Sequence, residues 1–346
     1  MIEKYNKIIE AREIIGEGKN DDYILKPTKH YEMFQSSAPE FAQTFRTSEI
    51  EAVAKKFEGH DNQANSARKI FKLYTKRVRW SLFTMVCFST ALIVVSSLFG
   101  QDVKSTFASI LFISFTILAI TAGYLTNTYL SLIKNKKLFE NWMKSRASAE
   151  MQRLEYFILV IKSTLGEVSI ENATSNKLLK LEFFRRFQLD MQINYYGNRG
   201  KDHRINAGKA ITISTWLLSG TSFTAAIAGI LGTALSPKWG IVAAIGLILQ
   251  ALATMVLTQE SVNQDQRNEE RYSRTKEALD KIRGRIDKVR ESVAEGNDDV
   301  LMSFVQTAHE QLSLEHRQWI DDMENVSKAL EELEQQLKKQ EEKINP

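Results

Sequence analysis

The stretch AITISTWLLSGTSFTAAIAGILGTALSP, residues 210–237, contains no Asp, Glu, Lys or Arg. Residues 80–101, 105–133 and 239–259 are also free of charge, although the chain holds 46 Lys and Arg and 42 Asp and Glu. Each stretch reaches the roughly 20 residues with which a helix crosses about 30 Å of hydrocarbon. A soluble globular domain mixes charged and apolar residues every few positions, so a soluble enzyme is disfavoured. The sequence predicts an all-α membrane protein with four spans.

The four spans are predicted to form two helical hairpins. Only residues 102–104 separate the first two charge-free stretches, and Lys238 alone separates the second two. Links this short force consecutive helices into antiparallel neighbours. We therefore expect two transmembrane hairpins, joined and flanked by polar helices.

Lysine and arginine predict the orientation of both hairpins. Each hairpin tip carries one lysine, Lys104 or Lys238, whereas the polar segments beside the other ends of the spans are rich in cations. Cytoplasmic segments carry the excess of Lys and Arg, so we expect a multi-pass protein of the cell (inner) membrane with cytoplasmic N- and C-termini. The flanking cations are Arg68, Lys69, Lys72, Lys76, Arg77, Arg79, Lys134, Lys136, Lys137, Lys144, Arg146, Arg199, Lys201, Arg204, Lys209, Arg267, Arg271, Arg274 and Lys276.

The order of polar and apolar segments indicates a coarse internal repeat. Residues 48–165 and 166–294 each read as helix, span, span and helix. Residues 48–79 run directly into the first span, and residues 134–165 form an amphipathic helix after the second. We assign them as two similar units. Residues 1–47 stand apart as an N-terminal cytoplasmic element that caps or docks, and residues 295–346 form a C-terminal coiled-coil helix.

Apolar spacing predicts how the C-terminal part packs. From Leu279 to Val293, and again from Leu301 to Leu337, apolar residues recur at intervals of three and four, as in a coiled-coil seam. The intervening sequence Glu295-Gly296-Asn297-Asp298 favours a helix stop and a turn. We expect residues 260–294 and 298–342 to form a long antiparallel helical hairpin.

Small residues in the third span are candidate helix-packing positions. Ala225 and Gly229 lie four positions apart, as do Ala228 and Gly232. This spacing lets helix backbones approach closely. These positions allow the third span to pack closely either on the other helix of its hairpin or on another subunit around a pore.

Two amides are candidate polar positions within the spans. Gln250 lies in the middle of the fourth span, and Asn127 lies toward the inner end of the second. An amide in hydrocarbon needs a hydrogen-bond partner or water, so each either lines a polar path or bonds within the chain. The spans contain no ionisable Asp, Glu, Lys or Arg, which argues against a proton-coupled transporter and a voltage sensor.

The sequence contains no constellation for catalysis, cofactor binding or metal binding. Phosphate-loop, dinucleotide-binding, HExxH and GxSxG patterns are all missing. The single cysteine, Cys87, lies in a span, and the five histidines are scattered, so we expect no metal site. The basic segments lack the interleaved aromatics of single-strand binding, so we expect no enzyme, no cofactor and no direct contact with nucleic acid.

One segment resembles a known family. Residues 138–150, LFENWMKSRASAE, follow the first hairpin, and their Trp142, Arg146, Ala149 and Glu150 resemble the W…R..AE stretch of the SLATT family. These are the SMODS- and SLOG-associating two-transmembrane effector domains of prokaryotic conflict systems. The resemblance covers residues 48–165 well and the second unit by architecture alone, so the chain is similar to a tandem, four-span member.

The resemblance implies a function that composition and spacing do not. It implies a membrane effector of anti-phage defence, a homo-oligomer that permeabilises or disrupts the bilayer when a cytoplasmic sensor or nucleotide-signalling partner is triggered. The alternative is a non-conducting membrane scaffold or receptor that docks cytoplasmic partners through its helical hairpins. A metabolic channel or transporter is disfavoured by the uncharged spans, and an enzyme by the missing chemistry.

Overall fold

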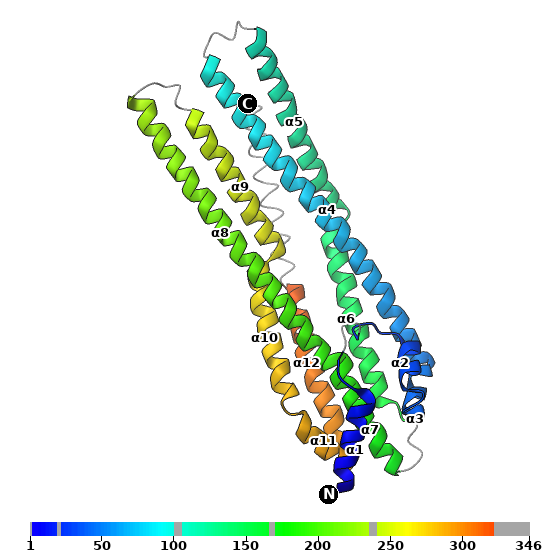
Figure 1. Cartoon of the computed structure of the whole chain (residues 1–346). Coiled ribbons are helices and arrows are strands. Elements are labelled where there is room, and N and C mark those ends of the chain that lie inside the picture. The colour runs from blue at the N-terminus through cyan, green and yellow to red at the C-terminus, as the bar shows by residue number, and fades with distance from the viewer. Residues whose placement is uncertain (1, 19–21, 100–105, 166–169, 235–240, 322–346) are drawn as a thin grey trace. The chain divides into compact units, whose positions relative to one another are not determined.

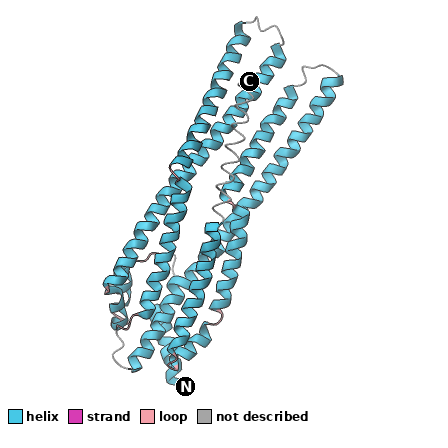
Figure 2. Cartoon of the chain, turned by 180° about the vertical axis from the view of Figure 1, so that it is seen from behind, coloured by secondary structure: helices cyan, strands magenta, loops and turns pink. Residues whose placement is uncertain are grey.

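The computed structural model of the chain describes residues 2–18, 22–99, 106–165, 170–234 and 241–321, and every regular element in these ranges is a helix (Figures 1 and 2). The protein is therefore an all-α membrane protein, as predicted, with four helices long and apolar enough to cross a membrane. The helices are α1 (Ile2–Ile15), α2 (Pro27–Phe34), α3 (Pro39–Gln43), the 3₁₀ turn η1 (Thr44–Arg46), α4 (Ser48–Phe99), α5 (Thr106–Asn135), α6 (Leu138–Lys162), α7 (Ile170–Phe184), the π-helix η2 (Arg185–Asp190), α8 (Met191–Ala234), α9 (Ile241–Asn263), α10 (Asp265–Arg283), α11 (Ile286–Ala294) and α12 (Asp298–Asp321).

The described residues form two compact units, each of which draws on both predicted repeats. One, which we call the bundle unit, contains residues 2–66, 141–202 and 267–321. The other, the span unit, contains residues 67–140 and 203–266. The division separates polar helices from apolar ones: the large hydrophobic core lies in the bundle unit, and the charge-free stretches lie in the span unit.

The core of the bundle unit is an aromatic centre. Phe34, Phe41 and Phe45 come from α2, α3 and η1, and they pack against Phe183 and Phe187 of α7 and η2. The ring centroids of Phe183 and Phe187 lie 4.7 Å apart, and those of Phe45 and Phe183 lie 5.1 Å apart. The N-terminal element therefore contributes to the same core as the segment between the hairpins.

The apolar seam of the C-terminal helices is buried in this unit too. Leu279, Ile286 and Val293 are buried on α10 and α11, and Leu301 and Ala308 are buried on α12. Helices α11 and α12 contact one another, and both also contact α7, while α11 contacts α1. The seam thus faces several helices rather than one partner. Its continuation past residue 321, to Leu337, lies outside the described residues.

The span unit contains the two hairpins. In the first, α4 and α5 meet through Phe88 and Phe115, whose ring centroids lie 5.9 Å apart, and through a 2.9 Å hydrogen bond from Thr126 Oγ1 to Ser81 Oγ. Much of the remaining surface of the spans is apolar and exposed, as in Phe107 and Ile120. Side chains of this kind suit contact with lipid.

Three helix breaks were not predicted: one at Gly284 and Arg285, between α10 and α11, and two that fall at equivalent places beside the hairpins. The segments 134–165 and 260–294 were each expected to be one helix, but Lys137 (φ 45°) separates α5 from α6 and Gln264 (φ 51°) separates α9 from α10. In both cases a left-handed residue ends the span helix by donating its N–H to a carbonyl of the last turn. The two residues are 127 positions apart, close to the offset of 130 between the starts of the first and third charge-free stretches at residues 80 and 210. This placement favours a common architecture for the two hairpins.

Candidate functional site

Helix α7 continues into α8 through a π-helical segment, Arg185–Asp190. Such segments insert one extra residue into the helical turn and occur frequently at functional sites. The insertion lies among apolar residues, yet it carries two consecutive arginines, Arg185 and Arg186, and both are buried. Consecutive residues of a helix point about 100° apart, so the two guanidinium groups reach different neighbours.

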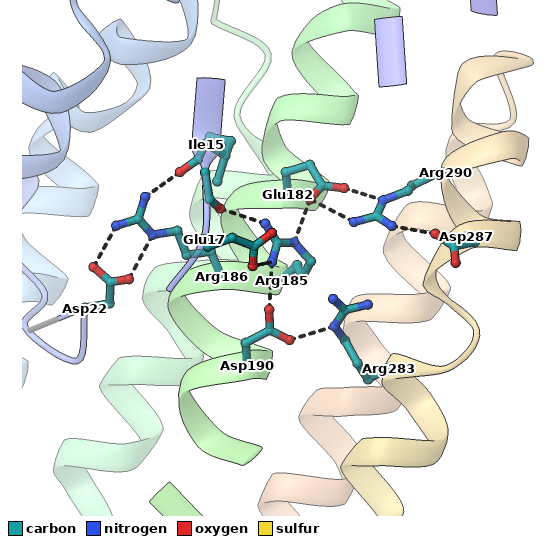
Figure 3. Close-up of polar contacts among 11 residues, drawn as sticks. Ile15, Glu17, Asp22, Glu182, Arg185, Arg186, Asp190, Arg283, Asp287 and Arg290 are labelled. Carbon is teal, nitrogen blue, oxygen red and sulfur yellow. Dashed lines mark hydrogen bonds and ion pairs between the residues drawn. The ribbon is translucent and has the colours of Figure 1, made fainter. Parts of the chain in front are cut away.

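Arg185 lies at the centre of a buried ionic network (Figure 3). Its Nε donates to Glu182 Oε2 at 2.6 Å, and its Nη1 donates to Asp190 Oδ2 at 2.8 Å. Its Nη2 donates to the carbonyl of Gly16 at 2.8 Å, and Nη1 also lies 3.3 Å from Glu17 Oε2. One side chain therefore joins the π-helix to the chain that follows α1.

The same network extends to the helices after the second hairpin (Figure 3). Arg290 of α11 donates from Nε and Nη2 to the two carboxylate oxygens of Glu182, at 2.5 and 3.0 Å. Arg283 donates to Asp190 at 2.6 Å. Such bidentate contacts fix orientation as well as charge. The network connects α7 and η2 to α10 and α11.

Arg186 holds the N-terminal element from the other side (Figure 3). Its Nε and Nη2 donate to the two oxygens of Asp22 at 2.8 and 3.1 Å, and its Nη1 donates to the carbonyl of Ile15. Both partners are almost fully buried, 5% and 3% exposed. We call Arg185 and Arg186, with their contacts to residues 15–22, the arginine clamp. A clamp of this kind can position a segment.

A second polar cluster contains the residues by which the family resemblance was recognised. Arg146 of α6 donates to Asp61 of α4 at 3.0 Å and pairs with Glu150 one turn away. The carboxylate of Glu150 raises the pKa of Arg146, although burial acts in the opposite direction. Trp142 is half-buried on the same helix. These motif residues support packing between α6 and α4.

Tyr196 and Glu315 form a buried polar pair between helices α8 and α12. Tyr196 of α8 donates to Glu315 Oε2 of α12 at 3.0 Å, and Arg271 Nε of α10 lies 3.4 Å from Glu315 Oε1. Burial raises the pKa of Glu315, and it raises that of Tyr196 well above its usual value. In the described residues we find no group of three or more His, Cys, Asp or Glu side chains arranged to hold a metal ion.

The candidate packing residues of the third span lie on two different faces. Ala228 is buried, whereas Ala225 and Gly229 are exposed. A Cβ built on Gly229 would meet nothing within 4 Å. Gly232 belongs to the last turn of α8, and its surroundings lie outside the described residues.

The second hairpin closes through other glycines. A Cβ on Gly246 of α9 would lie 2.7 Å from Thr224 Oγ1, and a Cβ on Gly220 would lie 3.0 Å from Leu249 Cδ1. Thr221 Oγ1 also lies 3.3 Å from the carbonyl of Gly246, which accepts its hydrogen bond. The seam within the hairpin therefore does not use Gly229.

The outward face of α8 carries a continuous row of small side chains. Thr215, Ser219, Ser222, Ala226 and Gly229 are all exposed. Their spacing of four, three, four and three residues places them on one side of the helix. We call these five residues the small-residue face.

Both candidate amides are exposed on span helices. In the part of the chain that the structure describes, the side chains of Asn127 on α5 and Gln250 on α9 form no hydrogen bond. The alternative of a bond within the hairpin therefore has no support from the described contacts. Because Leu249 contacts Gly220, Gln250 lies at the level of Ser219 and Ser222 of the small-residue face.

The arginine clamp was missed by sequence reasoning, although the sequence contains a signal for it. Residues 178–189, LLKLEFFRRFQL, are too apolar for a surface helix, yet they include Glu182, Arg185 and Arg186 at spacings of three and four. Charges in such a stretch must be paired when the helix is buried. The partners, however, come from segments more than 90 residues away, such as Asp22 and Arg290.

The comparison with known families finds one match. Residues 184–319 match the family described as SMODS and SLOG-associating 2TM effector domain 1. No curated protein and no solved structure matches the chain. The matched segment contains both spans of the second hairpin, in agreement with a two-transmembrane domain, and it begins next to η2.

The match agrees with the suspected family, but it covers a different part of the chain from the residues on which the resemblance was argued. The second unit was expected to resemble the family by architecture alone, but it is the unit that matches. Residues 138–150, on which the resemblance was argued, lie outside the matched segment, so a SLATT-like first unit stays a prediction. Residues 184–319 are thus similar to a two-transmembrane effector domain of the family that the resemblance suggested.

Proposed function

We propose that the protein is a defence effector that oligomerises in the inner membrane and permeabilises it when a cytoplasmic sensor or nucleotide-signalling partner is triggered. The observation that carries the proposal is the outer surface of the second hairpin. There, α8 carries the small-residue face, and α9 carries Gln250 at the same level, which forms no hydrogen bond in the described part of the chain. The proposal assigns the protein no catalytic step and no contact with nucleic acid.

The small-residue face supports packing between copies of the chain. Small side chains at this spacing drive association of membrane helices because the backbones can approach closely. The partner helix within the hairpin packs elsewhere, through Gly220, Gly246 and Ala228. A helix from a second copy is therefore the natural occupant of the face that contains Gly229.

Gln250 supports a polar path or a polar contact in the assembled state. An amide left in hydrocarbon without a partner costs several kcal/mol. Oligomerisation removes this cost if the amide bonds to another copy or lines a channel that contains water. Asn127 is exposed on α5 toward the inner end of its span. It needs a hydrogen-bond partner or water for the same reason.

Glycine substitutions test the assembly step. Gly229→Leu places a bulky side chain on the small-residue face without a clash inside the chain, so we expect insertion to persist while oligomers and toxicity are lost. Gly208→Leu is the matched control, because a Cβ there also meets nothing within 4 Å and the residue precedes the span. Crosslinking and growth arrest are measured at equal membrane abundance.

Gln250→Leu tests the polar path. We expect lower dye leakage and weaker growth arrest, with normal insertion. If Gly229→Leu and Gln250→Leu both retain full toxicity, pore formation through these spans is wrong, and the non-conducting scaffold becomes the better explanation. Leakage that requires coexpression of neighbouring genes would identify the sensor partner.

A further inference from the structure

The base of the first hairpin, residues 67–80 and 129–139, is far more basic than that of the second hairpin. Between Asp61 and Glu140 the sequence contains one acidic residue, Asp102, and it lies at the hairpin tip. The base itself contains nine cations and no carboxylate. They are Arg68, Lys69, Lys72, Lys76, Arg77, Arg79, Lys134, Lys136 and Lys137.

These cations lie near one another in the span unit. Aromatic contacts there join α4 to the end of α5 and to the start of α6. The ring centroids of Phe71 and Phe139 lie 5.2 Å apart, and those of Tyr74 and Tyr129 lie 6.0 Å apart. The guanidinium carbon of Arg77 lies 5.5 Å from the Tyr129 ring centroid. The side chains of Lys69, Lys72, Lys76, Arg77, Lys134, Lys136 and Lys137 are exposed.

Apolar side chains are exposed beside these lysines. On α4, Ile70, Leu73 and Trp80 are 43%, 48% and 51% exposed. Lysine stems can lie along such a surface while the ammonium groups reach phosphate, and tryptophan suits the headgroup layer. An exposed face that is both apolar and cationic fits a bilayer surface. Nucleic acid would leave the aliphatic side chains of Ile70 and Leu73 without an apolar partner.

The polar segments beside the second hairpin do not form a cationic surface free of carboxylates. Acidic residues lie among its cations: Arg199 Nη1 is 3.6 Å from Asp202, and His203 Nδ1 is 2.5 Å from Asp265. Lys137 of the first hairpin does pair with Glu140 at 3.4 Å, but that pair is exposed and contributes little. The two hairpins thus differ in charge although they share an architecture.

We infer that the base of the first hairpin binds the headgroups of anionic phospholipids in the adjacent leaflet of the membrane. Clusters of cations beside a span attract such lipids by about fivefold in affinity for each cation near the surface. Lys69, Lys72 and Lys76 lie on adjoining turns of α4 and present their charges over about 10 Å of helix. This inference concerns lipid binding and stands apart from pore formation.

Neutralising three lysines tests the inference. The variant Lys69→Gln/Lys72→Gln/Lys76→Gln keeps the other six cations of the base, so the orientation signal persists. The matched control Lys201→Gln/Arg204→Gln/Lys209→Gln removes three exposed cations beside the second hairpin. Binding of phosphatidylglycerol to the purified full-length chain is measured by native mass spectrometry at low salt, with phosphatidylcholine as the neutral lipid.

We expect about 100-fold weaker phosphatidylglycerol binding for the first variant, unchanged phosphatidylcholine binding, and little change for the control. The charge-preserving variant Lys69→Arg/Lys72→Arg/Lys76→Arg should bind like the original chain, which separates charge from folding. Equal losses in the first variant and the control, or no loss in either, would overturn the inference. Binding of a single-stranded oligonucleotide that disappears only in the first variant would also overturn it and assign the surface to nucleic acid.

Discussion

His30 lies in the aromatic centre, and its charge state links the stability of the bundle unit to pH. Burial lowers its pKa from 6.5 to about 3, and its Nδ1 lies 2.7 Å from the hydroxyl of Tyr156. Below about pH 6.5 an unfolded chain protonates this histidine while the folded chain keeps it neutral. The unfolded state then binds more protons, so the free energy of unfolding falls as the pH falls from about 6.5 toward 3.

Replacing His30 by Phe should remove this pH dependence. The slope of unfolding free energy against pH, measured by denaturant titration between pH 6 and 4, should decrease by up to about 1.4 kcal/mol per pH unit. His60→Phe, at a half-buried position outside the aromatic centre, is the control and should keep the original slope. An unchanged slope in the His30 variant would show that the buried imidazole is not the linked group.

Gly246 controls the packing of the second hairpin. Alanine there places its Cβ 2.7 Å from Thr224 Oγ1, so we expect a loss of about 1–3 kcal/mol in hairpin stability. Adding Thr224→Ala removes the opposing atom and should restore most of it. Steric-trap or denaturant measurements compare both variants with Gly208→Ala, which meets open space. No rescue by the second substitution would contradict the contact.

At the scale of elements, the arginine clamp joins the N-terminal element to the segment that matches the family, residues 184–319. Arg186→Ala leaves the buried carboxylate of Asp22 without this arginine, and breaking such a pair costs about 3–5 kcal/mol. We expect faster hydrogen exchange throughout α1. Arg283→Ala, which removes a half-buried partner of Asp190, should affect α1 less. Equal exchange of α1 in the two variants would show that the clamp does not hold this helix.

The elements differ in how far the sequence could predict them. Charge-free stretches are a local signal, so the spans and hairpins were predictable. The breaks at Lys137 and Gln264 were not, because neither residue is the glycine or asparagine that usually adopts the left-handed conformation at a helix end. The π-helix was not predictable either, since its buried arginines are stabilised by residues distant in sequence, such as Asp22 and Glu17. The sequence predicted small-residue packing but could not assign Ala228 to the inner face and Gly229 to the outer one.

At the scale of the whole molecule, the two hairpins share an architecture but carry different surfaces. The first has the basic base, and the second has the small-residue face and the family match. We propose a division of work, in which the first hairpin binds anionic lipid and the second hairpin assembles the oligomer. The Lys69→Gln/Lys72→Gln/Lys76→Gln variant should then lose binding of anionic lipid, whereas Gly229→Leu should lose oligomerisation.

The distribution of Lys and Arg predicts how both hairpins are oriented in the membrane. Nine cations flank the first hairpin at its base, whereas its tip offers Lys104 together with Asp102. Translocation of the polar segments would carry all of these charges across the bilayer, so the tips should be the outer parts. Reporter fusions after residues 60, 185 and 346 should therefore report the cytoplasm, and fusions near 103 and 237 the outside. A cytoplasmic signal at either tip would mean that its hairpin does not cross the membrane. An outside signal at residue 185 alone would place an odd number of spans before it, which contradicts the paired hairpins.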